Sequence, residues 1–483
     1  MLFNSFSFLI FFPTVTILYF LIPHAYRWLF LLVASCIFYM AFIPIYILVL
    51  GLTIAIDYTA AFLIERSEGK RRKLYLIVSI VSTCTVLFIF KYFNFFNTNL
   101  SQVARFFHWN YSIENLSLIL PIGLSFHTFQ SLSYVIEVYR KNFKAEHHFG
   151  IYSLYVMFYP QLVAGPIERP GNLIHQFYEK HLFDYQRVID GLKLMLWGFF
   201  KKVVIADKLA MVVDKVYSDP TQYTGLPLMA AAISFAIQVY CDFSGYSDIA
   251  IGSAQVMGFR LRDNFDRPLF SASVAEFWRR WHISLMSWFR DYVYIPLGGN
   301  RVSRGRRYFN LFFTFSLSGL WHGANWGMVL WGSFNGLYVI LSDFTVDLRK
   351  KGLTLTRLDR HPMLHRGIGI AFTFFLFWFT LIIFRTKDLS DGFYVMTHLV
   401  TGLGNLHDSF KSLYDVIPRY ELMTVLIAIA WMIFIEIVEK QEKMRRPFAT
   451  QPTLARWTIY YVLILFLIFF GEYNDQAFIY FQF

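Results

Sequence analysis

Residues 308–327 read YFNLFFTFSLSGLWHGANWG, a largely apolar run that ends in a histidine flanked by tryptophan and glycine. The basic stretch RVSRGRR (301–307) precedes it. About 13 residues separate that stretch from Trp321, and a helix of this length rises roughly 20 Å into a hydrocarbon core about 30 Å thick. Irregular backbone at this depth is tolerated only inside protein or beside a cavity. We therefore expect His322 to lie deep in a membrane domain, on backbone broken by glycine.

The composition of the whole chain supports a membrane location. Of its 483 residues, 56% are hydrophobic, 20% are aromatic and 16% are charged, whereas soluble domains carry about 25% charged residues. A soluble protein this apolar could not cover its surface with polar groups. The sequence therefore predicts an all-α, polytopic integral membrane protein.

Eleven apolar segments approach the length of about 20 residues that a membrane-spanning helix needs. They lie near 5–22, 27–47, 48–64, 74–92, 117–138, 150–165, 190–206, 227–258, 367–386, 421–438 and 456–471. The interrupted region 308–342 brings the expected number of passes to about eleven or twelve. No repeat, low-complexity segment or long linker divides the chain, so we expect a single membrane domain over residues 1–483.

The charge of the chain is concentrated in short loops. The net charge is +12, and basic residues gather at 66–73, 301–307 and 440–446. Short basic loops are typical of the cytoplasmic side of a bacterial membrane protein. We therefore expect a multi-pass protein of the bacterial cytoplasmic membrane, in contact with the lipid bilayer. No nucleic-acid-binding motif is present, and the three widely spaced cysteines predict no metal site.

Segment 259–307 carries ten arginines against four acidic residues and is expected at the cytoplasmic interface. Within it, EFWRRWHISLMSWFRDYVYIPLGG has helical periodicity, with Phe277, Trp281 and Leu285 on one face. An aromatic and arginine-bearing helix of this kind suits a membrane interface. His282 falls on or next to the apolar face, so we expect its ring to point into protein or membrane. Membership of an aromatic belt is the simpler alternative.

Several polar residues inside apolar segments are candidates for function. An ionisable residue deep in a membrane is a functional hypothesis by default, and a buried neutral histidine such as His322 is a plausible general base. The alternative is a core histidine that bridges two helices. Asp242 and Asp248 are expected at a helix break around Gly245, each bound by backbone or arginine, with a proton relay as the competing idea. His127 is expected in the core.

Five stretches together resemble the membrane-bound O-acyltransferase family, in its bacterial polysaccharide-acetylating branch. They are PIGLSFHTFQSLSYVIEVYR (121–140), FYPQLVAGPIERP (158–170), QVYCDFSGYSDIAIG (238–252), FWRRWHISLMSWFRDYVYIPLGGNR (277–301) and LWHGANW (320–326), and the final FIYFQF (478–483) is also similar. The resemblance implies a ring of helices and re-entrant segments around a central tunnel. It also implies that His322 is the essential catalytic residue and that His282 faces the reaction chamber. At His127 the branch usually has tyrosine or phenylalanine.

The resemblance further implies that acetyl-CoA is the donor, that it enters from the cytoplasm, and that a separate periplasmic acetyltransferase passes the acetyl group to a polymer. Such a transfer needs a base for the hydroxyl proton and a donor for the carbonyl oxygen. We expect His322 to be the base and His282, Asn325 or a backbone N–H near Gly323 to support the oxyanion. No tightly bound cofactor is expected.

Donor binding is expected to use basic and aromatic side chains near these histidines. The candidates are Arg279, Arg280, Arg301, Trp281 and Trp321, and Arg304, Arg306 and Arg307 belong to the same basic group. Arginine is well suited to phosphates such as those of a nucleotide. The alternative is that these arginines reflect only the preference for positive charge on the cytoplasmic side.

The sequence thus favours an O-acetyltransferase for cell-surface polysaccharide or exopolysaccharide. A non-catalytic transporter of acyl donor or polymer, with His322 and the two aspartates as a proton relay, is an alternative because broken helices suit both classes. A scaffold of a polysaccharide-modifying complex and a D-alanyl-transferring relative are further alternatives. The sequence does not select among alginate, peptidoglycan, teichoic acid and other exopolysaccharides.

Overall fold

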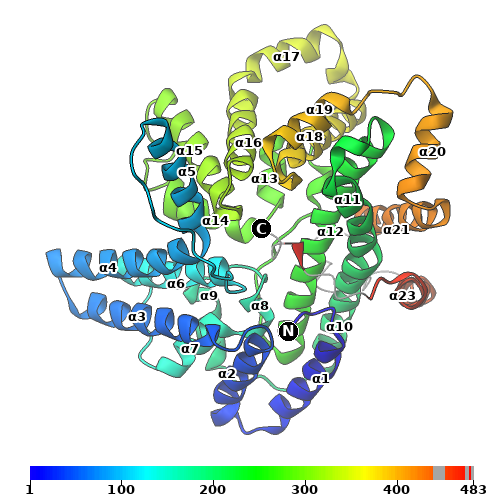
Figure 1. Ribbon diagram of the computed structural model, residues 1–483. Coiled ribbons are helices and arrows are strands. Elements are labelled where there is room, and N and C mark those ends of the chain that lie inside the picture. The colour runs from blue at the N-terminus through cyan, green and yellow to red at the C-terminus, as the bar shows by residue number, and fades with distance from the viewer. Residues whose placement is uncertain (439–451, 474–477, 480–483) are drawn as a thin grey trace. The chain divides into compact units, whose positions relative to one another are not determined.

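Every regular element that the described residues form is a helix (Figure 1). The computed structural model describes residues 1–438, 452–473 and 478–479. The basic loop 440–446 and most of the segment 478–483 lie outside them. The expected all-α class is confirmed. Contacts between residues group the chain into two compact units, residues 1–195 with 249–262 and residues 196–248 with 263–483.

The first unit contains the N-terminal helices. They are α1 (Phe6–Leu21), α2 (His24–Met40), α3 (Tyr46–Arg66), α4 (Gly69–Leu87), the π-helical turn η1 (Phe88–Tyr92), α5 (Phe93–Phe106), α6 (Leu124–Tyr139), α7 (Phe149–Met157), α8 (Tyr159–Leu162), α9 (Pro170–Leu173), η2 (Ile174–Phe177) and most of α10 (Tyr185–Phe199). The C-terminal part of α12 (Leu226–Met257) belongs to it as well.

The second unit contains most of the remaining elements. They are η3 (Phe200–Ala206), α11 (Asp207–Ser218), η4 (Pro220–Gln222), the first part of α12, η5 (Pro268–Phe270), α13 (Val274–Arg280), α14 (Ile283–Phe289), η6 (Arg290–Tyr294), α15 (Arg304–His322), α16 (Trp326–Phe344), α17 (Val346–Leu355), η7 (Leu358–Arg360), α18 (Pro362–Arg385), α19 (Leu389–His398), α20 (Leu406–Val416), α21 (Arg419–Val438) and α23 (Thr453–Phe470).

Six of the described helical segments are long and apolar enough to cross a membrane, and the bent pair α16–α17 makes a seventh if it is one span. The six are α3, the run α4–η1–α5, α12, α18, α21 and α23. Helices α1 and α2 are apolar too, but they have only 16 and 17 residues. The multi-pass class is therefore confirmed, and the expected eleven or twelve passes include segments that are short or broken.

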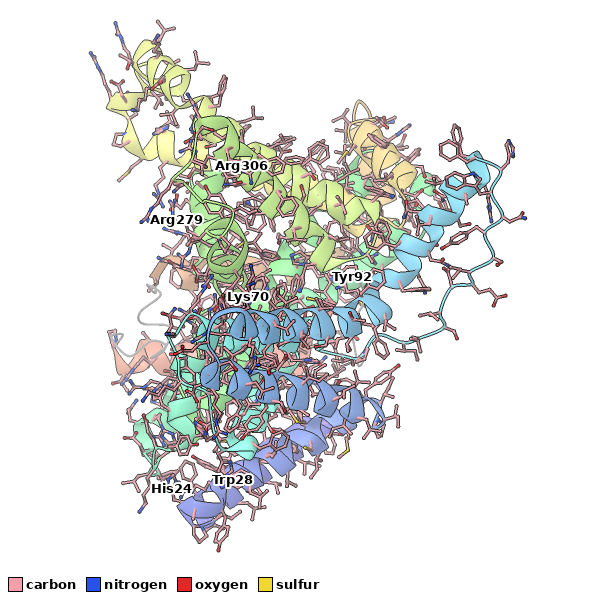
Figure 2. All side chains as sticks on the ribbon, turned by 90° about the vertical axis from the view of Figure 1, so that its left-hand side faces the viewer. His24, Trp28, Lys70, Tyr92, Arg279 and Arg306 are labelled. Carbon is pink, nitrogen blue, oxygen red and sulfur yellow. The ribbon has the colours of Figure 1, made fainter. Side chains whose placement is uncertain are left out.

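The first unit buries a carboxylate between apolar helices. Asp57 of α3 is fully buried and accepts hydrogen bonds from Ser79 (2.6 Å) and Thr83 (2.9 Å) of α4. These bonds satisfy a polar group that would otherwise be costly inside the unit. Figure 2 labels Lys70 and Tyr92, which mark the two ends of the run formed by α4 and η1.

Helix α12 runs without interruption through Gly245, so the expected helix break there is wrong. A Cβ atom at Gly245 would lie 2.7 Å from the carbonyl oxygen of Gly198. The glycine therefore permits a close approach of two backbones and does not end the helix.

Helices α15 and α16 form the tightest pair in the second unit and lie side by side (Figure 1). A Cβ atom at Gly319 would lie 2.2 Å from the carbonyl oxygen of Met328, and one at Gly332 would lie 2.3 Å from that of Phe315. Because backbone atoms occupy these positions, only glycine fits. The pair holds the short connection 323–325 and fixes the position of His322.

This packing predicts that Gly332→Ala destabilises the protein, by about 1–3 kcal/mol, because the added methyl group meets backbone that cannot move aside. Thermal unfolding of the detergent-solubilised protein measures the effect. Gly305→Ala, on the same helix pair but with open space around the added atom, is the control and should leave the unfolding temperature unchanged or slightly higher. Equal unfolding temperatures for the two variants would contradict the packing argument.

Candidate active site

His322 is the last residue of α15, and its side chain is buried in an aromatic setting. Its ring lies 5.1 Å from that of Trp331 in α16 and 5.8 Å from that of Phe384 in α18, in edge-to-face contacts. The helix continues through His322, and the break begins at Gly323. His322 is therefore helical, and the irregular backbone expected at this residue begins one position later. The expected burial of His322 beside a helix break is confirmed.

His282 interrupts the long helix that the sequence predicted. The segment forms α13 and α14 with His282 between them, and His282 adopts φ +43° and ψ +53°. A left-handed conformation costs a non-glycine residue roughly 1–2 kcal/mol. The expected continuous helix is therefore wrong, because the periodic pattern does not show this kink. The expectation that the ring points into protein is confirmed, since His282 is only 1% exposed.

Asn264 holds this kinked segment in place. Its backbone carbonyl accepts the N–H of Ile283 at 2.9 Å, and its side-chain Oδ1 accepts the N–H of Ser284 at 3.3 Å and the hydroxyl at 2.9 Å. The same Oδ1 lies 3.0 Å from Nδ1 of His282. Asn264 is 1% exposed. Sequence analysis missed this residue, because a single asparagine in a polar stretch gives no signal.

The contacts of Asn264 assign the tautomer of His282. A backbone N–H can only donate, so the side-chain atom that faces Ser284 is the carbonyl oxygen. That oxygen accepts, so Nδ1 of His282 carries the proton in the neutral ring and Nε2 is the acceptor nitrogen. Burial, together with nearby His322, holds the pKa of His282 well below its ordinary value. His282 is therefore neutral at physiological pH.

Trp321 brings the two histidines into one site. Its ring centroid lies 4.9 Å from that of His322 and 6.4 Å from that of His282. Trp321 is itself only 4% exposed. The structure thus places two of the predicted catalytic residues around one buried tryptophan, although they are 40 positions apart in the sequence.

Asn325, the third predicted catalytic residue, is the N-cap of α16. Its Oδ1 accepts the N–H of Met328 at 2.8 Å. Side chains of this kind satisfy a backbone donor that the helix leaves unpaired. The structure therefore gives Asn325 a local structural task that the sequence analysis did not assign.

The predicted donor-binding residues fall into two groups. Arg279 and Arg301 are exposed, whereas Arg280 forms an ion pair with Glu276 at 2.8 Å. Trp281 is buried and packs on the rings of Phe277 and other aromatic residues. Only the exposed arginines are positioned to meet a soluble ligand. No three metal-ligating side chains of the described residues gather in one place.

The buried aspartates pair with lysines. Lys202 lies 2.7 Å from Asp242 and 2.8 Å from Asp207, and Lys201 lies 2.6 Å from Asp248. Asp242 also accepts the backbone N–H of Ile479 at 2.7 Å. The expected backbone partner is confirmed for Asp242, and the expected arginine partners are wrong. The sequence signal that was missed is the pair of adjacent lysines inside the apolar segment 190–206.

The chain is similar to known proteins over most of its length. The model of the membrane-bound O-acyltransferase family matches residues 80–385. The chain is 38% identical to the probable alginate O-acetylase of Pseudomonas aeruginosa over 80% of this chain and 73% of that protein. It is 32% identical to the peptidoglycan O-acetyltransferase of Helicobacter pylori, over 83% and 80%.

A teichoic acid D-alanyltransferase of Streptococcus thermophilus is 27% identical over 56% of this chain and 69% of that protein. Identity and coverage are thus both higher for the two O-acetylating relatives. The family match includes α13 to α16 and α18, which carry both buried histidines and their aromatic neighbours. The chain is an O-acyltransferase and belongs to the membrane-bound O-acyltransferase family.

Proposed function

We propose that this protein transfers an acetyl group from cytoplasmic acetyl-CoA across the bacterial inner membrane, toward the hydroxyl groups of a cell-surface polysaccharide or exopolysaccharide. The observation that carries the proposal is the pair of buried histidines around Trp321 in a member of this family. The names of the alginate and peptidoglycan relatives support acetyl as the group transferred and polysaccharide as its destination. Transfer of D-alanine is the second candidate activity, because the match to the D-alanyltransferase is weaker.

The reaction joins a hydroxyl oxygen to the carbonyl carbon of a thioester and releases a thiol. His322 takes the hydroxyl proton, and the tetrahedral intermediate then collapses as the C–S bond breaks. The proton passes from the His322 imidazolium to the departing sulfur. Water is excluded by the aromatic rings of Trp331 and Phe384, which strengthens every charge interaction in the site.

The tautomer of His282 changes the role that the sequence suggested for it. A neutral ring protonated at Nδ1 offers a lone pair at Nε2, so His282 is a hydrogen-bond acceptor and not an oxyanion donor. Because the two rings lie close enough to interact electrostatically, this lone pair favours the positive charge that His322 carries as an imidazolium. In the connection 323–325 the N–H groups of Gly323 and Asn325 already donate to the carbonyls of Gly319 and Gly323. The backbone N–H of Ala324 is therefore the group that stabilises the oxyanion, as peptide groups do in other acyl transfers.

The donor enters from the end of the second unit that carries the exposed arginines. Arg279, Arg301 and Arg306 are exposed, and Arg307 forms an ion pair with Asp343. Figure 2 labels Arg279 and Arg306, whose guanidinium groups suit the phosphates of the nucleotide half of acetyl-CoA. The hydroxyl that receives the acetyl group belongs to a separate extracytoplasmic acetyltransferase, which passes the group from the resulting ester to a hydroxyl of the polymer.

Replacing His322 tests the chemistry. His322→Gln should lower single-turnover acetyl transfer from acetyl-CoA at least about 100-fold, because a general base contributes about 10²–10⁴-fold. Binding of acetyl-CoA, measured by calorimetry on the protein in lipid nanodiscs, should change little. His127→Gln, which alters an equally buried histidine in α6, is the control and should retain transfer. Undiminished transfer by His322→Gln would contradict the assignment.

Asn264 is a positioning residue that acts through His282. Asn264→Ala should lower kcat about 10-fold or more with little change in the KM for acetyl-CoA, because the ring loses its fixed tautomer. Asn264→Asp should restore most of kcat, since a carboxylate accepts the same hydrogen bonds.

The pH profile separates this role from a merely structural one. A carboxylate beside His282 favours the charged ring and raises its pKa. Because transfer requires neutral His282, the acidic limb of the kcat profile of Asn264→Asp should shift to higher pH. An unshifted profile, or equal loss of kcat in both variants, would contradict the tautomer assignment.

A further inference from the structure

Helix α17 turns away from α16 by 60° and, with η7 and the start of α18, lines an open surface crevice. The crevice has a volume of about 500 Å³. Its basic lining residues are Arg349 and Lys350, with the imidazole of His365 beside them, and its apolar lining includes Val346, Leu353 and Leu358.

The electrostatics of the crevice favour an anion. Segment 346–366 carries six lysine and arginine residues against two aspartates, Asp347 and Asp359. The guanidinium of Arg349 donates to the backbone carbonyl and to the hydroxyl of Ser342, which orients it. In the described part of the chain, no carboxylate forms an ion pair with Arg349, Lys350 or His365. The oriented guanidinium of Arg349 and the neighbouring ammonium of Lys350 are suited to phosphate.

The surroundings of the crevice are apolar. Leu348, Leu355 and Met363 are 66%, 86% and 89% exposed. A short helix that presents exposed leucines together with lysine and arginine is typical of a segment that lies in the interface of an anionic membrane. A pocket for a soluble nucleotide would not require this apolar surround.

The position of the crevice agrees with a membrane surface. Helix α18, which forms one wall, is long and apolar enough to cross the membrane, and the crevice lies at its first residues. Arg307 at the start of α15 pairs with Asp343 at the end of α16, so the crevice shares its end of the second unit with the basic loop 301–307. Figures 1 and 2 show α17 at this end, close to the labelled Arg306 in Figure 2.

We propose that this crevice binds the phosphate headgroup of an anionic phospholipid such as phosphatidylglycerol. Arg349, Lys350 and His365 face the phosphodiester, Val346, Leu353 and Leu358 contact the glycerol backbone, and the acyl chains extend into the bilayer beside Leu355 and Met363. A preference for positive charge on one side of the membrane accounts for the basic residues but not for their position beside an open, partly apolar crevice.

Native mass spectrometry of the full-length protein in detergent, titrated with phosphatidylglycerol or phosphatidylcholine, tests the proposal. The double variant Arg349→Gln/Lys350→Gln should lower the affinity for phosphatidylglycerol at least about 5-fold and leave that for phosphatidylcholine unchanged. The control Lys351→Gln/Arg357→Gln removes the same charge from exposed positions of the same segment that do not line the crevice. It should change the affinity less than about 2-fold.

Three results would overturn the proposal. Equal loss in the control would mean that diffuse charge attracts the lipid. Displacement of phosphatidylglycerol by acetyl-CoA would assign the crevice to the acyl donor. Displacement by inorganic phosphate at millimolar concentration would mean that the site takes a free anion and not a headgroup. All four altered side chains are exposed, so both double variants should fold like the unaltered protein. Circular dichroism verifies this.

Discussion

The close contact of α15 with α16 is the constraint on which the site depends. A polar backbone that is broken inside a membrane domain must be satisfied by protein, because hydrocarbon offers no hydrogen bonds. Gly319 and Gly332 allow the two backbones to touch, and Asn325 caps the start of α16. As a result, three residues are enough to connect α15 with α16. His322 stands at this connection, directly before its peptide groups.

A strained backbone and the hydrogen bonds of Asn264 together fix the position of His282. The left-handed backbone at this residue costs free energy, and the hydrogen bonds of Asn264 to the following two residues offset that cost. The same side chain fixes the tautomer of the ring. Strain that is held by several hydrogen bonds at one histidine is a sign of a functional constraint. Both histidines thus lie near Trp321, His322 at the end of α15 and His282 at the kink between α13 and α14.

The sequence predicts the helical membrane class and the burial of both histidines, because apolar length and composition carry that information directly. It does not predict the kink at His282, since aromatic periodicity continues across it. It places a break at Gly245, where glycine instead serves close packing against Gly198. It misses Asn264, Lys201 and Lys202, whose importance comes from neighbours distant in the chain. Periodicity describes one helix at a time, whereas these features arise from contacts between elements.

His322 takes the transferred proton, and His282 acts in the same step by favouring the imidazolium that His322 becomes. A double-mutant cycle of single-turnover acetyl transfer, with His282→Gln, His322→Gln and the double variant, tests this joint role most directly. Residues that act as a unit are strongly non-additive, so the double variant should be no slower than the slower single variant. Effects that multiply in the double variant would show that the two histidines act independently, and would contradict their joint role in one step.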